Sequence, residues 1–381
     1  EDVYYHATGT PRINDLKDDI KRMESRSSDI LVEVSSIGVP NIKLLKKTYD
    51  DKAGLFEEEK IKCESIGKKY RYNLVTKSPY LFLKKGIEDS VEIIQNAVEL
   101  GHLPVRHRKQ FADELPMSVI ADQIGIPRTE LKEYKKRADL AIGGIEHKVP
   151  PELEKKTFIA GREMQQFFLS VAEERRQNPK DDIMTTLATA EVETDDESRR
   201  LNDDEILSIL QQLQVAGKET TAHCLGMTML ALLENPEQME ALQNDPSLIP
   251  NMVEESLRFE APVRALFRVA TKDTELGGQP IAKGQTLMLI YAAANRDNEQ
   301  FPEAEKFDVF RENSRNQMSF SAGPHYCVGS ALARLEIRVA YEELLSRMKN
   351  IRRDPDYPDP THTQSFILRG LSDLHLLFDK A

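Results

Sequence analysis

The sequence predicts a mainly α-helical fold with small β-sheets, and three observations support this. From residue 87 onward apolar residues recur at three- and four-residue spacing, beginning with Val91, Ile94 and Val98. A segment of about thirty residues from Asn202 carries a helix start signal and no strong breaker. Strand-like stretches with turn residues are confined to short parts of the chain.

The composition is that of a globular protein with a sizeable core, because 40% of the 381 residues are hydrophobic. The net charge is −12, from 52 basic and 64 acidic residues, which argues against a nucleic-acid surface as the main function. The three cysteines are too few for a disulfide framework and favour a reducing, cytoplasmic setting. No run of 18 apolar residues and no signal peptide are found, so we expect no membrane partner.

The elements follow from local patterns. Residues 1–80 are mixed, with strand-like pieces such as 30–34. A helix is expected over 116–126, closed by Gly125 and Pro127, followed by charged amphipathic helices over 129–179. Residues 190–202 are expected to be a polar connection. The stretch 267–291 predicts strands, with turns at Gly277–Gly278 and Gly284, and 360–378 predicts a small hairpin with Gly370 near its turn.

The longest helix is expected to begin at a capping box, Asn202 to Glu205, and to run to about Glu234. Its middle contains Ala216, Gly217, Lys218, Glu219, Thr220 and Thr221. A glycine weakens a helix by about 1 kcal/mol relative to alanine, and threonine hydroxyls compete for the i−4 carbonyl. This segment is either a small-residue packing contact or a functional distortion.

Cys327 lies on a glycine-punctuated loop, 320–329, directly before another amphipathic helix. A thiolate there would meet the positive end of a helix dipole, which lowers a thiol pKa and favours metal binding. Gly323 and Gly329 would let the backbone approach a flat ligand. The alternative is a buried structural cysteine.

The loop resembles the haem-ligand loop of the cytochrome P450 family, Phe-x-x-Gly-x-x-x-Cys-x-Gly. The matching residues are Phe320, Gly323, Cys327 and Gly329, with His325 as in many bacterial members. The resemblance implies the cytochrome P450 fold, a triangular helical domain enclosing haem b (iron protoporphyrin IX), with Cys327 as the axial ligand of the iron. We therefore expect a single domain over 1–381, in which 1–86 is atypical or incomplete.

Two further segments resemble the family. Residues 216–220 match its distal-helix motif, which implies that Ala216 and Gly217 leave room for dioxygen. By the same resemblance Glu219 belongs to a proton path and Thr220 orients water in it. Glu255 and Arg258 match a buried Glu-x-x-Arg pair, although an exposed ion pair is the usual fate of such spacing. The family adds a third, basic partner, and Lys306 stands where arginine is more typical.

The remaining site residues are expected from position. Arg268 and His325 match contacts to the haem propionates. The family's N-terminal His-x-x-x-Arg propionate segment is not found, and Lys68, Lys69 and Arg71 are the substitutes. Substrate contacts are expected from residues that are equally compatible with ordinary core or surface: Leu213, Val263, Arg264, Leu266, Phe366 and Ile367.

The resemblance implies a soluble bacterial-type monooxygenase that uses O2 to hydroxylate or epoxidise a small hydrophobic molecule. Electrons would come from NAD(P)H through a ferredoxin or flavodoxin, which Arg334 and Arg338 could help to dock. Three alternatives stay open: a peroxide-driven enzyme, a haem-binding sensor or sequestering module without turnover, and a helical scaffold without haem.

Overall fold

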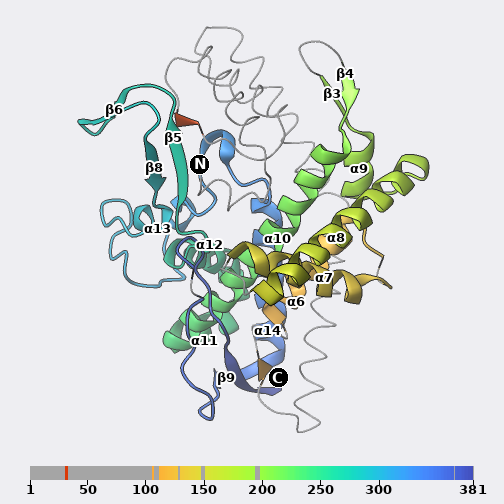
Figure 1. Cartoon of the computed structure of the whole chain (residues 1–381). Coiled ribbons are helices and arrows are strands. Elements are labelled where there is room, and N and C mark those ends of the chain that lie inside the picture. Colours follow the sequence, from red (N-terminus) through yellow and green to blue (C-terminus); the bar gives the residue numbers. More distant parts are fainter. Residues whose placement is uncertain are drawn as a thin grey trace. The chain divides into compact units, whose positions relative to one another are not determined.

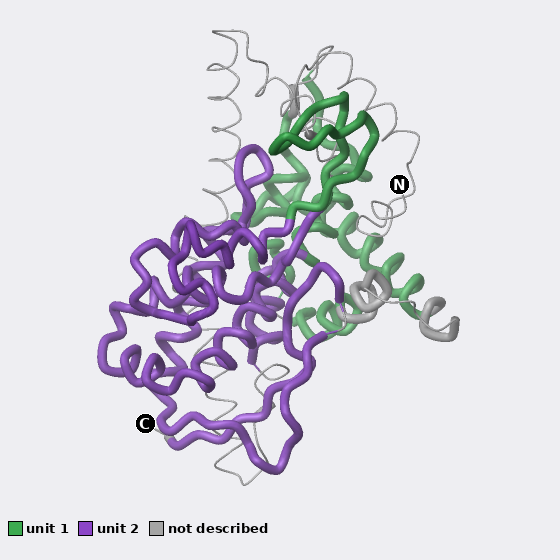
Figure 2. The backbone as a smooth tube through the Cα atoms, turned by 90° about the vertical axis from the view of Figure 1, so that its left-hand side faces the viewer, with its two compact units in different colours: residues 1–73, 121–215, 267–289 green, residues 74–120, 216–266, 290–381 purple. Residues whose placement is uncertain are grey.

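The structure is a computed structural model that describes residues 111–127, 129–146, 151–193, 198–363 and 365–380, with strands β1 (Leu31–Val32) and β2 (Val105–Arg106). Two compact units divide the chain (Figure 2). Unit 1 comprises residues 1–73, 121–215 and 267–289, and unit 2 comprises residues 74–120, 216–266 and 290–381. The expected helix after residue 87 and the fallback cations Lys68, Lys69 and Arg71 lie outside the described residues.

Unit 1 contains a group of packed helices, namely α7 (Leu131–Glu146), α8 (Pro151–Gln177) and α9 (Ile183–Thr189). Its three-stranded sheet has the order β1-β5-β8, where β5 is Leu266–Ala270 and β8 is Thr286–Leu289 (Figure 1). The strand expected near residue 30 is therefore confirmed at β1. The hairpin of β6 (Thr274–Leu276) and β7 (Gln279–Ile281) turns at Gly277 and Gly278, both at positive φ, as the sequence predicts.

The expectation of a plain connection over 190–202 was wrong. Strands β3 (Glu191–Glu193) and β4 (Ser198–Arg200) form an antiparallel hairpin there. Glu191 lies opposite Arg200 in the register, so opposite charges face each other across the strands. The segment lacks the apolar alternation by which a strand is recognised in a sequence, and backbone pairing supplies the structure instead.

Helix α10 (Asp203–Glu234) contributes residues 203–215 to unit 1 and the remainder to unit 2. Its capping box is present as expected, with Glu205 N donating to Asn202 Oδ1 at 2.9 Å and Asn202 N donating to Glu205 Oε2 at 2.8 Å. Helix α6 (Glu114–Ile124) begins two residues before the predicted start, and Gly125 ends it at a φ of 93°.

Unit 2 is built on buried faces of α10, α12 (Ile249–Phe259) and α14 (Ser330–Arg347). Helices α11 (Pro236–Asn244) and α12 both pack against α14. Tyr341 on α14 is buried and donates its hydroxyl to the carbonyl of Leu225 on α10 at 2.7 Å. This contact ties the second half of α10 to α14 within one core.

Unit 2 has a three-stranded sheet with the order β2-β10-β9, in which β9 is Met348–Arg353 and β10 is His375–Lys380. The C-terminal hairpin predicted over 360–378 is present only in part: His362 pairs with Leu371 in an isolated bridge, and Thr363 N donates to Gly370 O at 2.9 Å. Residues 375–378 belong instead to β10, which pairs with β2 and β9. Residues 290–329 of unit 2 form a largely irregular stretch that contains α13 (Tyr291–Ala294) and three-residue 3₁₀ turns at Ser314–Asn316 and Gly323–His325.

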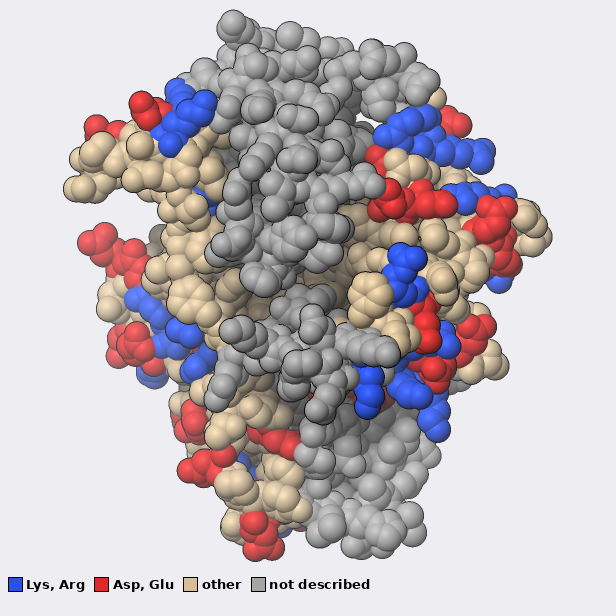
Figure 3. All heavy atoms as spheres, in the orientation of Figure 1, with Lys and Arg blue, Asp and Glu red and all other residues tan. Residues whose placement is uncertain are grey.

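Charged side chains of both signs are interspersed over the described residues on the face drawn in Figure 3. Among the described residues, no helix is both long and apolar enough to cross a membrane.

Candidate functional site

The Cys327 loop is held by its own backbone. Cys327 N donates to Phe320 O at 2.9 Å, which closes the loop, and Tyr326 N donates to Gly323 O at 3.0 Å. Ser321 and Gly323 have positive φ values of 60° and 70°. Cys327 lies three residues before the first residue of α14, so the thiol precedes a helix as the sequence predicts.

The two loop glycines differ in their roles. Gly323 needs the conformational freedom of glycine because its φ is positive. Gly329 has a φ of −83°, which any residue adopts, and a Cβ added there would lie 3.9 Å from Cys327 Sγ. Conformation therefore explains Gly323 but not Gly329, whose lack of a side chain leaves the approach to the sulfur open.

The two described cysteines have different environments. Cys224 on α10 is buried, and burial raises the pKa of its thiol to about 12. Cys327 is partly exposed. A thiolate ligand needs a low pKa and access for the metal. Of the two described cysteines, Cys327 has the access that a ligand requires, and it is not the fully buried structural cysteine that was its alternative.

The predicted propionate contacts fall in different units. His325 is partly exposed and lies on the 3₁₀ turn two residues before Cys327, in unit 2. Arg268 lies on β5 in unit 1, where it is buried and donates Nη1 to the carbonyl of Phe267 at 2.9 Å.

In the middle of α10, Ala216 is exposed to solvent and Gly217 is packed against a neighbouring helix. Ala216 is exposed, and Thr220 is partly exposed with its hydroxyl donating to Ala216 O at 2.8 Å. A Cβ on Gly217 would lie 3.1 Å from two side-chain carbons of Ile120 on α6. The packing interpretation thus accounts for Gly217, whereas Ala216 and Thr220, one turn apart on the same side of the helix, keep exposed surface.

Glu219 is buried beside two basic groups that sequence reasoning missed. Lys218 Nζ lies 3.2 Å from Glu219 Oε1, and His223 Nε2 lies 3.9 Å from Oε2. His223 is itself buried and packs against Gly370, where a Cβ would come within 2.6 Å of the ring carbon Cε1. The i, i+4 spacing of Glu219 and His223 was the available signal.

The Glu255–Arg258 pair is buried, not exposed. Arg258 donates Nε and Nη2 to the two carboxylate oxygens of Glu255, at 2.7 and 2.8 Å. The third basic partner is Arg311, whose Nε lies 3.2 Å from Glu255 Oε1. Lys306 was the wrong candidate, because it contributes only its backbone carbonyl, which accepts from both arginines.

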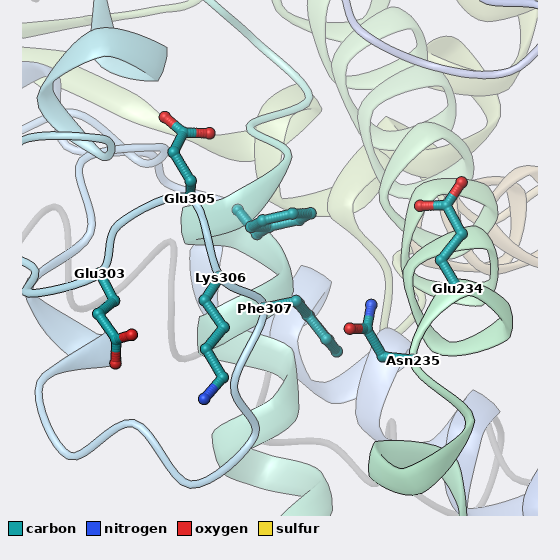
Figure 4. A pocket seen from close by; sticks show the side chains of 7 residues that line it. Glu234, Asn235, Glu303, Glu305, Lys306 and Phe307 are labelled. Atoms are coloured by element: carbon teal, nitrogen blue, oxygen red, sulfur yellow. The ribbon is translucent and has the colours of Figure 1, made fainter.

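The side chain of Lys306 lines a shallow pocket instead (Figure 4). The other residues that line it are Glu234, Asn235, Phe259, Glu303, Glu305 and Phe307. None of the predicted substrate residues is among them, so this pocket is not the predicted substrate site.

Arg334 on α14 is tied to the Cys327 loop and to α12. It donates Nε and Nη2 to the carboxylate of Glu254 at 2.5 and 3.1 Å, and Nη1 to the hydroxyl of Tyr326 at 3.0 Å. Its guanidinium lies 4.5 Å from the ring centroid of Phe320. Arg338 pairs with Glu342 at 2.8 Å, one turn along the same helix. The two arginines expected to dock a partner therefore have different surroundings.

Most of the predicted substrate residues lie on two segments of unit 2 that are paired with each other. Arg264 N donates to Ile367 O at 2.7 Å, and Val263 pairs with Leu368 in an isolated antiparallel bridge. Arg264 and Phe366 have exposed side chains, and Leu266 begins β5. Leu213 belongs to the part of α10 that lies in unit 1.

Comparisons with known proteins place the chain in one family. The family model of cytochrome P450 matches residues 133–376. Cytochrome P450 107B1 of Saccharopolyspora erythraea is 35% identical over 266 residues, which cover 70% of this chain and 63% of that protein. The steroid C26-monooxygenase of Mycobacterium tuberculosis is 36% identical over 271 residues, covering 71% of each chain.

The fold is also similar to solved structures. The crystal structure of CYP109E1 from Bacillus megaterium in complex with testosterone matches with a TM-score of 0.74 and 25% identity, over 94% of this chain and 91% of that one.

Proposed function

The chain belongs to the cytochrome P450 family, and we propose that it is a haem-thiolate monooxygenase. It would insert one oxygen atom of O2 into a C–H bond or an alkene of a small hydrophobic molecule. The observation that carries the proposal is the position of Cys327, a partly exposed thiol on a closed loop directly before the 18-residue helix α14.

The residues present fit a haem. The family implies haem iron, and in cytochromes P450 the protein supplies one cysteine thiolate to that iron. Cys327 suits this role for two reasons: the neighbouring Gly329 presents no side chain to its sulfur, and the other described cysteine, Cys224, is buried. His325 and Arg268 are the proposed hydrogen-bond partners of the two propionates. When bound, the haem supplies dioxygen activation.

The protein's own part in the reaction would be proton delivery. Thr220 presents a partly exposed hydroxyl on α10, and Glu219 is the next residue, buried between Lys218 and His223. A hydroxyl and a carboxylate in that order relay protons through ordered water. Ala216, exposed one turn earlier, leaves space beside Thr220.

The substrate class is proposed from the relatives and from side-chain character. One relative acts on a steroid, and one similar structure holds testosterone. The adjoining segments 263–266 and 366–367 present mainly apolar side chains, with Leu213 as a further candidate. We therefore propose a steroid-sized apolar molecule as the first class to test, with Arg264 available for an acidic group on it.

Electrons would come from NAD(P)H through a ferredoxin or a flavodoxin in the cytoplasm. The peroxide-driven and sensor alternatives remain distinguishable by turnover. With a surrogate reductase, the parent should oxidise NADPH in step with product, whereas Thr220→Ala should release peroxide instead of product. Equal coupling in both proteins would count against the role of Thr220. Product formed from added peroxide but not from NADPH would favour the peroxide-driven enzyme, and no turnover with any ligand would favour a sensor.

The first experiment tests whether Cys327 is the thiolate ligand of the haem. It records the carbon monoxide difference spectrum of the reduced, purified protein. We expect the Soret band of a thiolate–haem complex in the parent and in Cys224→Ser, and its loss in Cys327→Ser. A thiolate band that survives in Cys327→Ser would overturn the assignment of Cys327.

A further inference from the structure

Arg334 contacts both ends of the loop that carries Cys327. Its guanidinium lies against the ring of Phe320, whose carbonyl accepts the hydrogen bond from Cys327 N. It also donates to the hydroxyl of Tyr326, the residue bonded directly to Cys327. The Phe320 and Tyr326 rings are themselves 6.3 Å apart and tilted. One side chain therefore touches the residue that closes the loop and the residue that precedes the sulfur.

The carboxylate that binds Arg334, that of Glu254, is itself held in place by its surroundings. Glu254 is buried and lies on α12 next to Glu255, the carboxylate that pairs with Arg258 and Arg311. It also accepts a hydrogen bond from Gln317 Nε2 at 3.1 Å. The two nitrogens of Arg334 that face Glu254 form a bidentate pair, which fixes direction as well as distance.

The geometry argues against a docking role for the Arg334 charge. Its side chain is 31% exposed and its partner Glu254 is 7% exposed, so a buried carboxylate takes up the cation. The Arg338 side chain is 43% exposed. Arg338 thus remains the surface cation of this pair, while Arg334 faces inward to the loop.

We propose that Arg334 and Glu254 form a positioning clamp for the Cys327 loop, which keeps the sulfur where it ligates haem iron. The inference rests on the proposed function and adds residues outside the loop to it. Loss of a group that orients a metal ligand typically lowers metal affinity about 10- to 100-fold. Loosening the clamp should therefore weaken the hold of the loop on the haem iron.

The test measures how fast the thiolate band of the reduced carbon monoxide complex decays in the holoenzyme, alongside the unfolding midpoint. Arg334→Lys keeps the charge but loses the fork, and Tyr326→Phe removes one hydroxyl only. Arg338→Gln is the matched control, because it breaks an ion pair on the same helix without touching the loop.

We expect the band to decay about tenfold faster in Arg334→Lys and in Glu254→Gln, with a smaller acceleration in Tyr326→Phe. The control should match the parent. Because Arg334 and Glu254 act together, the band of the double variant should decay no faster than the band of whichever single variant decays faster.

Two failures are distinguishable. A parent without a thiolate band would overturn the proposed function and this inference with it. A parent with the band whose Arg334→Lys and Tyr326→Phe variants decay like Arg338→Gln would overturn the clamp alone, even if their unfolding midpoints fall.

Discussion

Arg258 and Glu255 form a two-point ion pair at 2.7 and 2.8 Å, with both side chains completely buried. Arg258 also donates Nη1 to the carbonyls of Asn295 and Ala304, at 2.9 and 2.8 Å. A buried charge that lost its partner would cost several kcal/mol, so each added donor matters. The pair thus ties α12 to the irregular stretch that leads to the Cys327 loop.

The first prediction concerns the third member of this cluster. Arg311→Met should lower the free energy of unfolding by about 2–4 kcal/mol, because Glu255 loses a donor and buried carbonyls lose theirs. Lys306→Met is the control and should stay within about 0.5 kcal/mol of the parent, since the carbonyl of residue 306 remains. Urea unfolding of both variants measures this. Equal losses in the two would mean that the Lys306 ammonium matters after all.

The second prediction concerns the contact of Gly370 with His223. A methyl group at Gly370 would overlap the imidazole, although no positive φ is involved there. Gly370→Ala should therefore cost about 1–3 kcal/mol through overpacking. Gly161→Ala is the matched control: its Cβ meets nothing within 4 Å in α8, and it should stabilise the helix by up to about 1 kcal/mol.

The same pair allows a double-variant cycle. His223→Ala removes the ring with which the new methyl group collides, so Gly370→Ala should cost much less in that background. An unchanged cost would show that the strain lies elsewhere. Circular dichroism during thermal unfolding is sufficient to compare the four proteins.

The third prediction separates the cysteines by reactivity. The remaining cysteine of the sequence, Cys63, is first replaced by serine. In this background at pH 8, Cys224 should resist alkylation in the native protein, because its pKa of about 12 and its burial leave almost no accessible thiolate. Cys327 should react in haem-free protein that keeps its helical content and be protected once haem is bound. Mass spectrometry of the labelled peptides gives the result. Protection of Cys327 without haem, or rapid labelling of Cys224, would contradict it.

Much of the candidate site was predictable because its signals are local. The capping box at Asn202 fixed the start of α10, and the spacing around Cys327 placed the sulfur before a helix. The strands at 267–291 followed from turn residues, and Gly277 and Gly278 do adopt positive φ. Each of these depends on residues within one turn or one helix of each other.

The parts that sequence reasoning missed depend on contacts between distant segments. Arg311 lies in irregular chain without any period, and its partners are largely backbone carbonyls that no sequence pattern marks. Arg334 looks like a surface cation on α14 until Glu254 on α12 is brought beside it. The contact of Gly370 with His223 could not be predicted for the same reason. The glycine is needed because the imidazole packs against it, and not because of its own backbone conformation.

The last prediction concerns Glu336, a buried carboxyl on α14. Burial raises its pKa well above the ordinary carboxyl value, and its Oε2 has no hydrogen-bond partner within the described part of the chain. The folded protein therefore keeps a proton that the unfolded chain releases above about pH 4.3. Above that pH the unfolded state binds fewer protons, so the stability of the parent falls as pH rises toward the folded pKa.

Glu336→Gln cannot ionise and should escape this loss. We expect its stability relative to the parent to increase from pH 5 to pH 8, by at most about 1.4 kcal/mol for each pH unit. Urea unfolding at several pH values measures the difference. Glu342→Gln is the control, because it removes a partly exposed carboxylate from the same helix and reports any general effect of lost charge. A difference for Glu336→Gln that does not change with pH would mean that the carboxyl is ionised in the folded protein.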